Sequence, residues 1–156
     1  EECLDSENDY VKKVREYADK EGSEVLTICG KLESEIAALD TAEEKEEFME
    51  AAGIEVSGLE LLTHAAYKML GLRTYFTAGV QEVRAWTFRA GAKAPECAGV
   101  IHTDFERGFI KADIYHCEDL FEFETEGKVK ENGKLRIEGK DYVVKDGDVI
   151  HFKFNV

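Results

Sequence analysis

Apolar side chains recur every three or four residues through most of the first 71 positions, a spacing typical of amphipathic helices. In the stretch DYVKKVREYADKEG they stand at Tyr10, Val11, Val14, Tyr17 and Ala18. The stretch KLESEIAAL repeats the spacing at Leu32, Ile36 and Leu39. Gly22 follows the first set, and glycine readily takes the left-handed conformation that ends a helix. The pattern therefore predicts two helices, the first ending at Gly22.

Two capping boxes mark the starts of two further helices. Thr41 precedes Glu44 and Ser57 precedes Glu60, so in each pair a hydroxyl can accept an amide while the carboxylate reaches back. The apolar residues that follow them are Phe48, Met49 and Ala52 in one case and Leu59, Leu62, Ala66, Met69 and Leu70 in the other. The glycine after each set is predicted to end the helix.

One segment of this half departs from the helical spacing. Residues 24–29, EVLTIC, form a short apolar run between two predicted helices, which is typical of a buried parallel strand in an α/β sheet. A single strand cannot form a sheet, so its neighbours are expected in sequence outside this chain. We therefore predict that residues 1–40 are the last piece of a larger α/β domain. The lack of an initiator methionine agrees with a piece of a longer protein.

Beyond residue 71, apolar and polar side chains alternate, so the hydrophobic pattern repeats every two residues. EVRAWTFR alternates as a strand does, and FIKADIYH sets Ile110, Ala112 and Ile114 against Lys111, Asp113 and Tyr115. Pro95 suits the first turn of a short helix in APECAGVIH. KLRIEGKDYVV predicts a strand, a turn and a strand, and VIHFKFNV a closing strand after the turn KDGD. This order predicts an α+β fold, a β-grasp in which a mixed sheet wraps over one helix.

Charge divides the chain at the same place. Residues 1–71 hold 19 acidic and 7 basic residues, a net charge of −12, whereas residues 72–156 hold 15 and 13, a net charge of −2. The first half is expected to repel nucleic acid. No apolar run approaches the roughly 18 residues of a membrane span, and the start EECLDSEND is unlike a signal peptide. The four cysteines form no CxxC pair, which fits reduced thiols in a cytoplasmic protein.

Two long motifs of the second half carry a family resemblance. IHTDFERGFIKADI, followed further along by YVVKDGDVIHF, resembles the TGS domain, a ubiquitin-like β-grasp module of threonyl-tRNA synthetases, stringent-response nucleotide synthetases and translation-linked GTPases. LRTYFTAGVQEVRAWTFRAGAKAPECAGVIHTDFERGFIKADI and LRIEGKDYVVKDGDVIHFKFNV resemble the C-terminus of the YchF, or Obg-like, ATPase family. DYVKKVREYADKEGSEVLTICGKLESEIAAL resembles the end of that family's nucleotide-binding domain. The resemblance implies that residues 1–71 end a P-loop G domain with acidic helices and that residues 72–156 form a TGS domain.

The resemblance also implies where a nucleotide would lie. In the family, Cys29, Gly30 and Lys31 stand at the fifth nucleotide-binding motif, beside the base, and alanine is usual at Gly30. The parent protein is expected to be a P-loop ATPase that binds ATP, or GTP, with Mg²⁺. This sequence lacks the phosphate loop G-x-x-x-x-G-K-[ST], and the Asn-x-x-Glu base-reading motif and the metal-binding switch are expected upstream. We therefore expect no catalytic residue and no strong nucleotide binding here. The Cys29 thiol is either redox-sensitive beside the nucleotide or a buried thiol at the end of a core strand.

Histidines and cysteines of the second half offer two further candidate sites, which we interpret as structural. His102 and Asp104 form either an acid–base pair or a helix end and turn, in which Asp104 would bond turn amides. The turn is favoured because no cleft is predicted around them. His116, Cys117 and Cys97 suggest a metal site, but closed zinc sites need four ligands, usually in close pairs. We therefore predict no metal.

The YchF family associates with ribosomes, so the resemblance implies the ribosome, through ribosomal RNA or protein, as the partner. Trp86 and Phe88 form either a stacking platform for RNA bases or part of the core. The cations expected to face phosphates are Arg84, Arg89, Lys93, Arg107 and Lys111. We expect neither a membrane nor DNA as a partner. The alternative is a free-standing β-grasp interaction or carrier module, although carriers end in Gly-Gly and this chain ends HFKFNV. A small metal or redox enzyme is a third interpretation, against which the spacing argues.

Overall fold

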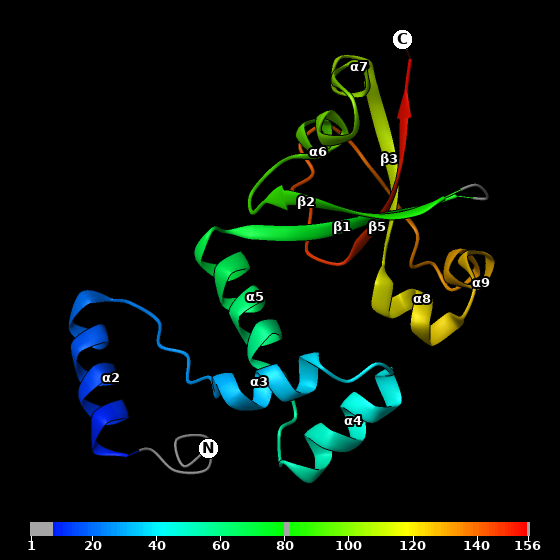
Figure 1. The fold of residues 1–156 in the computed structure, drawn as a ribbon. Helices are drawn as coiled ribbons and strands as arrows, with labels where there is room; N and C mark the ends of the chain where they lie inside the picture. The colour runs from blue at the N-terminus through cyan, green and yellow to red at the C-terminus, as the bar shows by residue number, and fades with distance from the viewer. Residues whose placement is uncertain (1–7, 80–81, 156) are drawn as a thin grey trace. The chain divides into compact units, whose positions relative to one another are not determined.

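The computed structural model describes residues 8–79 and 82–155, which divide into two compact units between Tyr67 and Lys68. We call residues 8–67 the helical unit and residues 68–155 the sheet unit. The described residues form helices α2 to α9 and strands β1 to β5, with the strands confined to the sheet unit (Figure 1). This confirms the predicted α+β class, in which helices precede a mixed sheet.

Four helices of the first half lie where the sequence predicts, although α3 ends before Leu39, which the predicted stretch included. They are α2 (Asp9–Glu21), α3 (Gly30–Ala37), α4 (Ala42–Ala51) and α5 (Gly58–Met69), the last of which runs into the sheet unit. Gly22 ends α2 with a φ of 68°. At the start of α4, Thr41 and Glu44 make both hydrogen bonds of the capping box. At the start of α5, the Ser57 hydroxyl accepts the Glu60 amide at 3.2 Å.

Residues 24–29 form no strand in this structure, and the strand predicted there stays a prediction because its neighbours were expected in sequence outside this chain. Residues 23–29 form a non-helical connection between α2 and α3 and belong to no sheet. A strand is defined by ladder hydrogen bonds to a neighbour, and the described residues offer this segment none. Leu26 and Ile28 are 37% and 41% exposed, so this apolar run is not buried as the side chains of a central strand would be.

Five strands of the sheet unit form one mixed sheet. They are β1 (Leu72–Ala78), β2 (Val83–Arg89), β3 (Phe109–His116), β4 (Arg136–Glu138) and β5 (Asp148–Phe154). Their order across the sheet is β2-β1-β5-β3-β4. β1 runs parallel to β5, and the other neighbouring pairs are antiparallel. This is the β-grasp arrangement expected from the sequence, with the first and last strands side by side.

The sheet is covered on both faces by short helices: α6 (Ala94–Ile101), α7 (Thr103–Arg107), α8 (Cys117–Phe123) and α9 (Glu126–Glu131). On one face, Tyr75, Phe88 and Ile150 pack with residues of α6 in the larger apolar cluster. On the other face, Tyr115 and Val149 pack with residues of α8 and α9 in a second cluster. The first cluster is the core under the predicted grasp helix, whereas the second was not anticipated.

Two predictions about strands are corrected by the structure. The first concerns the alternation of buried residues along β3, and the second concerns a strand expected in KLRIEGKDYVV. Ile110 is 56% exposed, because the β3–β5 register shifts between Phe109 and Lys111, and Tyr115 is buried. The alternation along FIKADIYH is therefore not the simple one predicted. The second strand expected in KLRIEGKDYVV is absent from the described strands, and its segment makes only an isolated bridge between Val143 and Lys93.

Candidate functional site

The candidate nucleotide-base loop opens helix α3. Cys29 is the N-cap residue, in an extended conformation, and Gly30 and Lys31 are the first two residues of the helix. The backbone amide of Leu32 lowers the pKa of the Cys29 thiol, with a smaller contribution in the same direction from the Lys31 amide, while burial opposes both. Free amides at a helix start favour negative charge, so the thiolate is the form this position stabilises.

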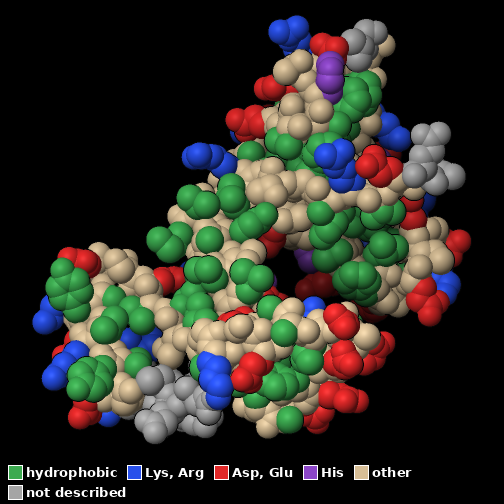
Figure 2. Space-filling model, in the orientation of Figure 1, with side chains coloured by type: hydrophobic (Ala, Val, Ile, Leu, Met, Phe, Trp, Pro, Cys, Tyr) green, Lys and Arg blue, Asp and Glu red, His purple; other side chains and the backbone are tan. Residues whose placement is uncertain are grey.

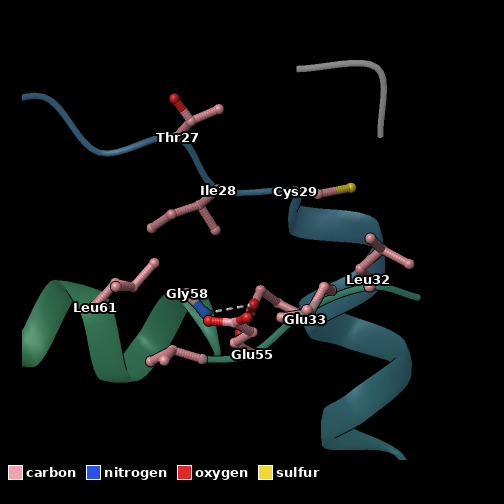
Figure 3. A pocket seen from close by; sticks show the side chains of 11 residues that line it. Thr27, Ile28, Cys29, Leu32, Glu33, Glu55, Gly58 and Leu61 are labelled. Carbon is pink, nitrogen blue, oxygen red and sulfur yellow. Dashed lines mark hydrogen bonds between the residues drawn. The ribbon is translucent and has the colours of Figure 1, made fainter. Parts of the chain in front are cut away.

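Cys29, but neither Gly30 nor Lys31, lines a pocket of about 350 Å³ (Figure 3). Its other walls come from residues 27–28, 32–33, 53–56, 58 and 61 of the helical unit. Gly58 at the start of α5 donates its backbone N–H to the Glu33 carboxylate at 2.7 Å, a bond that links α5 to α3. Ile28 and Leu61 line the apolar part of the pocket, and the sulfur of Cys29 points away from them (Figure 3).

Gly30 and Lys31, the other two residues of the loop, make few contacts that the structure describes. A Cβ atom added at Gly30 meets no heavy atom within 4 Å, so alanine, the usual residue of the family, fits here without a clash. Lys31 lies 3.9 Å from Glu35 one turn along α3, and both side chains are largely exposed. Such a pair contributes little to stability, and the ammonium can leave it at low cost.

The structure places the Cys117 sulfur 4.0 Å from Nδ1 of His116 but leaves Cys97 apart from both, in another cluster. Cys97 is fully buried in the cluster under α6, and burial raises the pKa of its thiol to about 12. Cys117 packs in the cluster on the opposite face of the sheet. His116 caps α8, with Nδ1 accepting the Glu118 amide at 3.3 Å and Nε2 lying 2.9 Å from the Asp146 carbonyl. Within residues 8–79 and 82–155, no three His, Cys, Asp or Glu side chains form a metal-binding group.

His102 and Asp104 lie at a helix end and turn, with the capping roles opposite to those expected. We expected Asp104 to bond the turn amides. Instead, the Nδ1 atom of His102 accepts the Asp104 amide at 3.2 Å, and the Asp104 carboxylate lies 3.4 Å from the same nitrogen. His102 thus joins the end of α6 to the start of α7.

The candidate aromatic platform is built into the sheet. Phe88 is 3% exposed and belongs to the core. Trp86 packs at the edge of that core and donates its Nε1–H to the Thr77 hydroxyl at 2.9 Å. The Arg84 guanidinium stands over the Trp86 ring, 4.1 Å from its centre. The guanidinium covers one face of the Trp86 ring, and the burial of Phe88 leaves that ring unavailable for stacking on a base.

The five candidate cations occupy different elements of the sheet unit. Arg84 and Arg89 lie on β2, Lys93 caps α6, Arg107 ends α7 and Lys111 lies on β3. Arg84 shares a sheet face with Trp86 and Phe88, the face under α6.

Lys111 shares the opposite face with Tyr115. Lys93 is engaged with Asp141 at 2.8 Å, a hydrogen bond that raises the pKa of the ammonium. The set therefore does not form one continuous patch.

A buried carboxylate that the sequence reasoning missed stabilises the turn before β5. Asp148 is fully buried and accepts the Tyr142 hydroxyl and the Lys145 amide, each at 2.8 Å. Arg136 lies 3.6 Å from its other oxygen. Burial, followed by the hydrogen bond to Asp148, raises the pKa of Tyr142 to about 12. An aspartate that opens a strand directly after a Gly turn was the available signal.

With this geometry in place, comparison with known proteins assigns the family. The model of the YchF-GTPase_C family, described as a protein of unknown function (DUF933), matches residues 72–155, more than half of the chain. This chain belongs to the YchF-GTPase_C family. Within residues 8–79 and 82–155, no helix is long and apolar enough to span a membrane.

Relatives and a solved structure extend the similarity to the helical unit. The chain is 60% identical over 151 residues to the ribosome-binding ATPase YchF of Bacillus subtilis, covering 97% of this chain and 41% of that protein. It is 45% identical over 159 residues to Obg-like ATPase 1 of Pongo abelii, covering 96% of this chain and 40% of the relative. The structure of the Schizosaccharomyces pombe YchF GTPase superposes with a TM-score of 0.84 at 38% identity, covering 94% of this chain and 39% of that chain. The chain thus spans about two fifths of the length of these proteins.

Proposed function

We propose that this chain is the C-terminal portion of a YchF-type, translation-associated ATPase, in which residues 72–156 form a TGS domain that docks on the ribosome. The observation that supports this most strongly is the 60% identity to the ribosome-binding ATPase of Bacillus subtilis across 97% of the chain. A protein that binds ribosomes works in the cytoplasm, where its thiols stay reduced.

In this proposal, residues 1–71 complete the G domain at the base side of the nucleotide. Cys29, Gly30 and Lys31 supply backbone amides at the start of α3, a place where a polar ligand edge finds hydrogen-bond donors. ATP, or GTP, with Mg²⁺ would be held mainly by the phosphate loop of the parent. Because the sequence here contains no such loop, we expect the isolated chain not to hydrolyse nucleotide.

The difference in net charge between the two halves favours the sheet unit as the part that contacts the ribosome. The first half carries a net charge of −12 and the second −2, so ribosomal phosphates repel the helical half far more strongly. Arg84, Arg89, Lys93, Arg107 and Lys111 remain the candidate contacts to RNA or to a ribosomal protein. Since Arg84 and Lys111 lie on opposite faces of the sheet, a flat RNA surface would engage only part of this set.

Ribosome co-sedimentation over a salt series tests the proposal. The chain is compared with a variant carrying Arg84→Glu, Arg107→Glu and Lys111→Glu. The matched control carries Lys130→Glu, Lys140→Glu and Lys145→Glu, which reverse three exposed charges elsewhere in the same unit. We expect the first variant to bind more weakly and with a salt dependence shallower by about one to three counterions, while the control binds like the original chain.

Equal binding by the original chain and both variants, or binding that is independent of salt, would exclude these cations from the interface. Loss of binding in both variants would point to general charge rather than to a docking surface.

A further inference from the structure

The last strand of the sheet has an unpaired edge. β1 pairs with β5 at one register position, Phe76 opposite Val149, and the two strands then diverge (Figure 1). β3 pairs with the other edge of β5 as far as Phe154. In the part of the chain that the structure describes, no strand pairs with the second edge of β5 beyond Val149. Such an edge presents backbone N–H and C=O groups that a further strand can pair with.

A groove of about 540 Å³ lies along this edge. Its apolar lining comes from the end of β1, from α6 and α7, and from β5, at Ala78, Ile101, Phe105, Phe152 and Phe154. The rings of Phe105 and Phe154 stack with their centres 3.7 Å apart. The unpaired edge therefore adjoins an apolar floor.

The two sides of β5 at this edge differ in chemistry. Phe152 faces the apolar cluster under α6, whereas Lys153 faces the opposite side, directly across from Lys111 on β3. Like charges at directly opposite positions repel each other. Asp113 lies 3.8 Å from Lys153, and the lysine side chain is still 52% exposed.

Further along the same face, Glu126 lies 3.5 Å from His151. Among the described residues, no carboxylate pairs with Lys111. Lys111 on β3 is therefore the described cation of this face without a carboxylate, and Lys153 lines the groove together with Glu82.

We propose that this edge of β5 binds an extended peptide segment in which apolar and acidic residues alternate. Paired with β5, such a segment would place its apolar side chains toward Ile101, Phe105 and Phe152 and its carboxylates toward Lys153 and Lys111. Only a polypeptide offers N–H and C=O groups at the spacing of a sheet edge, which favours a peptide over RNA. The inference goes beyond the proposed function, because it concerns another surface and does not require the ribosome.

The test measures binding of a fluorescent synthetic peptide of seven residues, in which isoleucine and glutamate alternate, to the 156-residue chain. A peptide of the same composition with its isoleucines grouped at one end is the ligand control. The two groove variants are Lys153→Glu and Gly79→Glu. Gly79 lines the groove, and among the described residues a Cβ there comes near the Glu82 carbonyl alone, at 3.7 Å, so a side chain can begin there without a clash. The controls, Lys130→Glu and Gly139→Glu, make the same charge changes at exposed positions that do not line the groove.

We expect the alternating peptide to bind more tightly than the grouped one and to shift the backbone amide NMR signals of residues 150–154. Each groove variant should weaken binding by about fivefold to tenfold, the range for a lost and reversed surface charge contact, while both controls bind normally. Because Gly79 and Lys153 lie on different elements, misfolding of one variant leaves the other as the test.

Equal affinity for the two peptides, no binding, or normal binding by both groove variants would overturn the proposal. The same holds if a single-stranded RNA shifts the β5 amides and the peptide does not, because the groove would then take nucleic acid. Ribosome co-sedimentation of the same variants reports on the proposed function separately, since a failed peptide site leaves it unchanged.

Discussion

The two units of this chain bury their apolar residues to very different extents. Among the described residues, the sheet unit buries thirteen apolar side chains and the helical unit two, Ala18 and Ile36. On α2, the apolar residues Tyr10, Val14 and Tyr17 are 79%, 54% and 62% exposed, and Figure 2 shows hydrophobic side chains over this helix. Both units therefore have well-formed local structure, but only one has its own core.

The difference shows which physical terms define each unit. Helices α2 and α4 rest on caps and on local spacing, which act within a few residues. The sheet unit rests on pairings between residues far apart in the chain, such as Tyr115 opposite Val149. The curated relatives are more than twice as long as this chain, and we propose that their additional residues cover a stripe like that on α2. Five measurements test this contrast.

Thiol reactivity should give the largest contrast between the units. In a Cys3→Ser, Cys117→Ser background, we expect Cys29 to react with a thiol reagent at least about 1,000-fold faster than Cys97. The Cys29 thiol has a lowered pKa at a helix start, whereas Cys97 is fully buried and must wait for opening of the unit. Stopped-flow labelling with mass spectrometry measures both rates. Comparable rates would mean that the sheet unit opens freely.

Alkaline pH should weaken the sheet unit selectively. Burial raises the pKa of the Cys97 thiol from 9.0 to about 12, so the folded state holds a proton that the unfolded state releases. The contribution of this group is complete below pH 9 and is lost as the pH rises from 9 through 12, by about 4 kcal/mol in all. Urea unfolding followed by Trp86 fluorescence at several pH values measures it. A Cys97→Ala variant should lose less stability over the same range, and an equal loss would contradict this assignment.

Removing the buried carboxylate should cost nearly as much. Asp148→Ala leaves the Tyr142 hydroxyl and the Lys145 amide without their acceptor, which we expect to destabilise the sheet unit by about 3 kcal/mol. The control is Asp141→Ala, whose 95%-exposed carboxylate pairs with Lys93 on the surface and whose loss should change little. Chemical denaturation with Trp86 fluorescence distinguishes them. Similar small effects from both would show that the buried network is not needed.

The same contrast explains what the sequence could predict. Gly22 and the Thr41–Glu44 box were read correctly, because caps and helical spacing depend on adjacent residues. The strand at residues 24–29 stays a prediction, because a strand depends on a partner and the described residues supply none. The turn at His102 and Asp104 was predicted correctly, but the side chain that accepts the turn amide was not. His102 accepts the Asp104 amide, and which side chain does so depends on a geometry that the sequence does not give.

Burial along the strands was harder to predict for a related reason. The alternation in β3 assumed one buried face, but α8 and α9 cover the second face and bury Tyr115, while a bulge exposes Ile110. The Asp148 network was missed because its partners come from different parts of the chain. The family resemblance placed Cys29 at a nucleotide-base motif, whereas its position at the start of α3 and the pocket beside it required the structure.

Within the helical unit, we expect Gly58→Ala to have a moderate effect. A Cβ at this position lies 2.7 Å from Ile28 Cγ2 and 2.9 Å from Glu33 Oε1, so the link between α3 and α5 must shift. We expect the helical unit to lose about 1–2 kcal/mol of its free energy of unfolding. The thermal transition in the far-ultraviolet circular dichroism should then fall to a lower temperature, while the transition in Trp86 fluorescence is unchanged. Glu33→Gln keeps the acceptor for the Gly58 amide and should be milder. A transition that moves equally in both probes would show that the units unfold as one.

The smallest expected effect has the opposite sign. Gly30→Ala places a methyl group in open space at the first residue of α3, and Gly30 is not among the glycines with a positive φ. Alanine restricts the unfolded chain and favours the helix, so we expect a gain of about 0.5–1 kcal/mol in the helical unit. Gly127→Ala in α9, where a Cβ also meets nothing within 4 Å, is the matched change in the sheet unit. Circular dichroism should show the first gain and Trp86 fluorescence the second. If Gly30→Ala instead destabilises the helical unit while Gly127→Ala stabilises the sheet unit, the start of α3 depends on the freedom of glycine, and the loop beside the pocket is held by more than local helix formation.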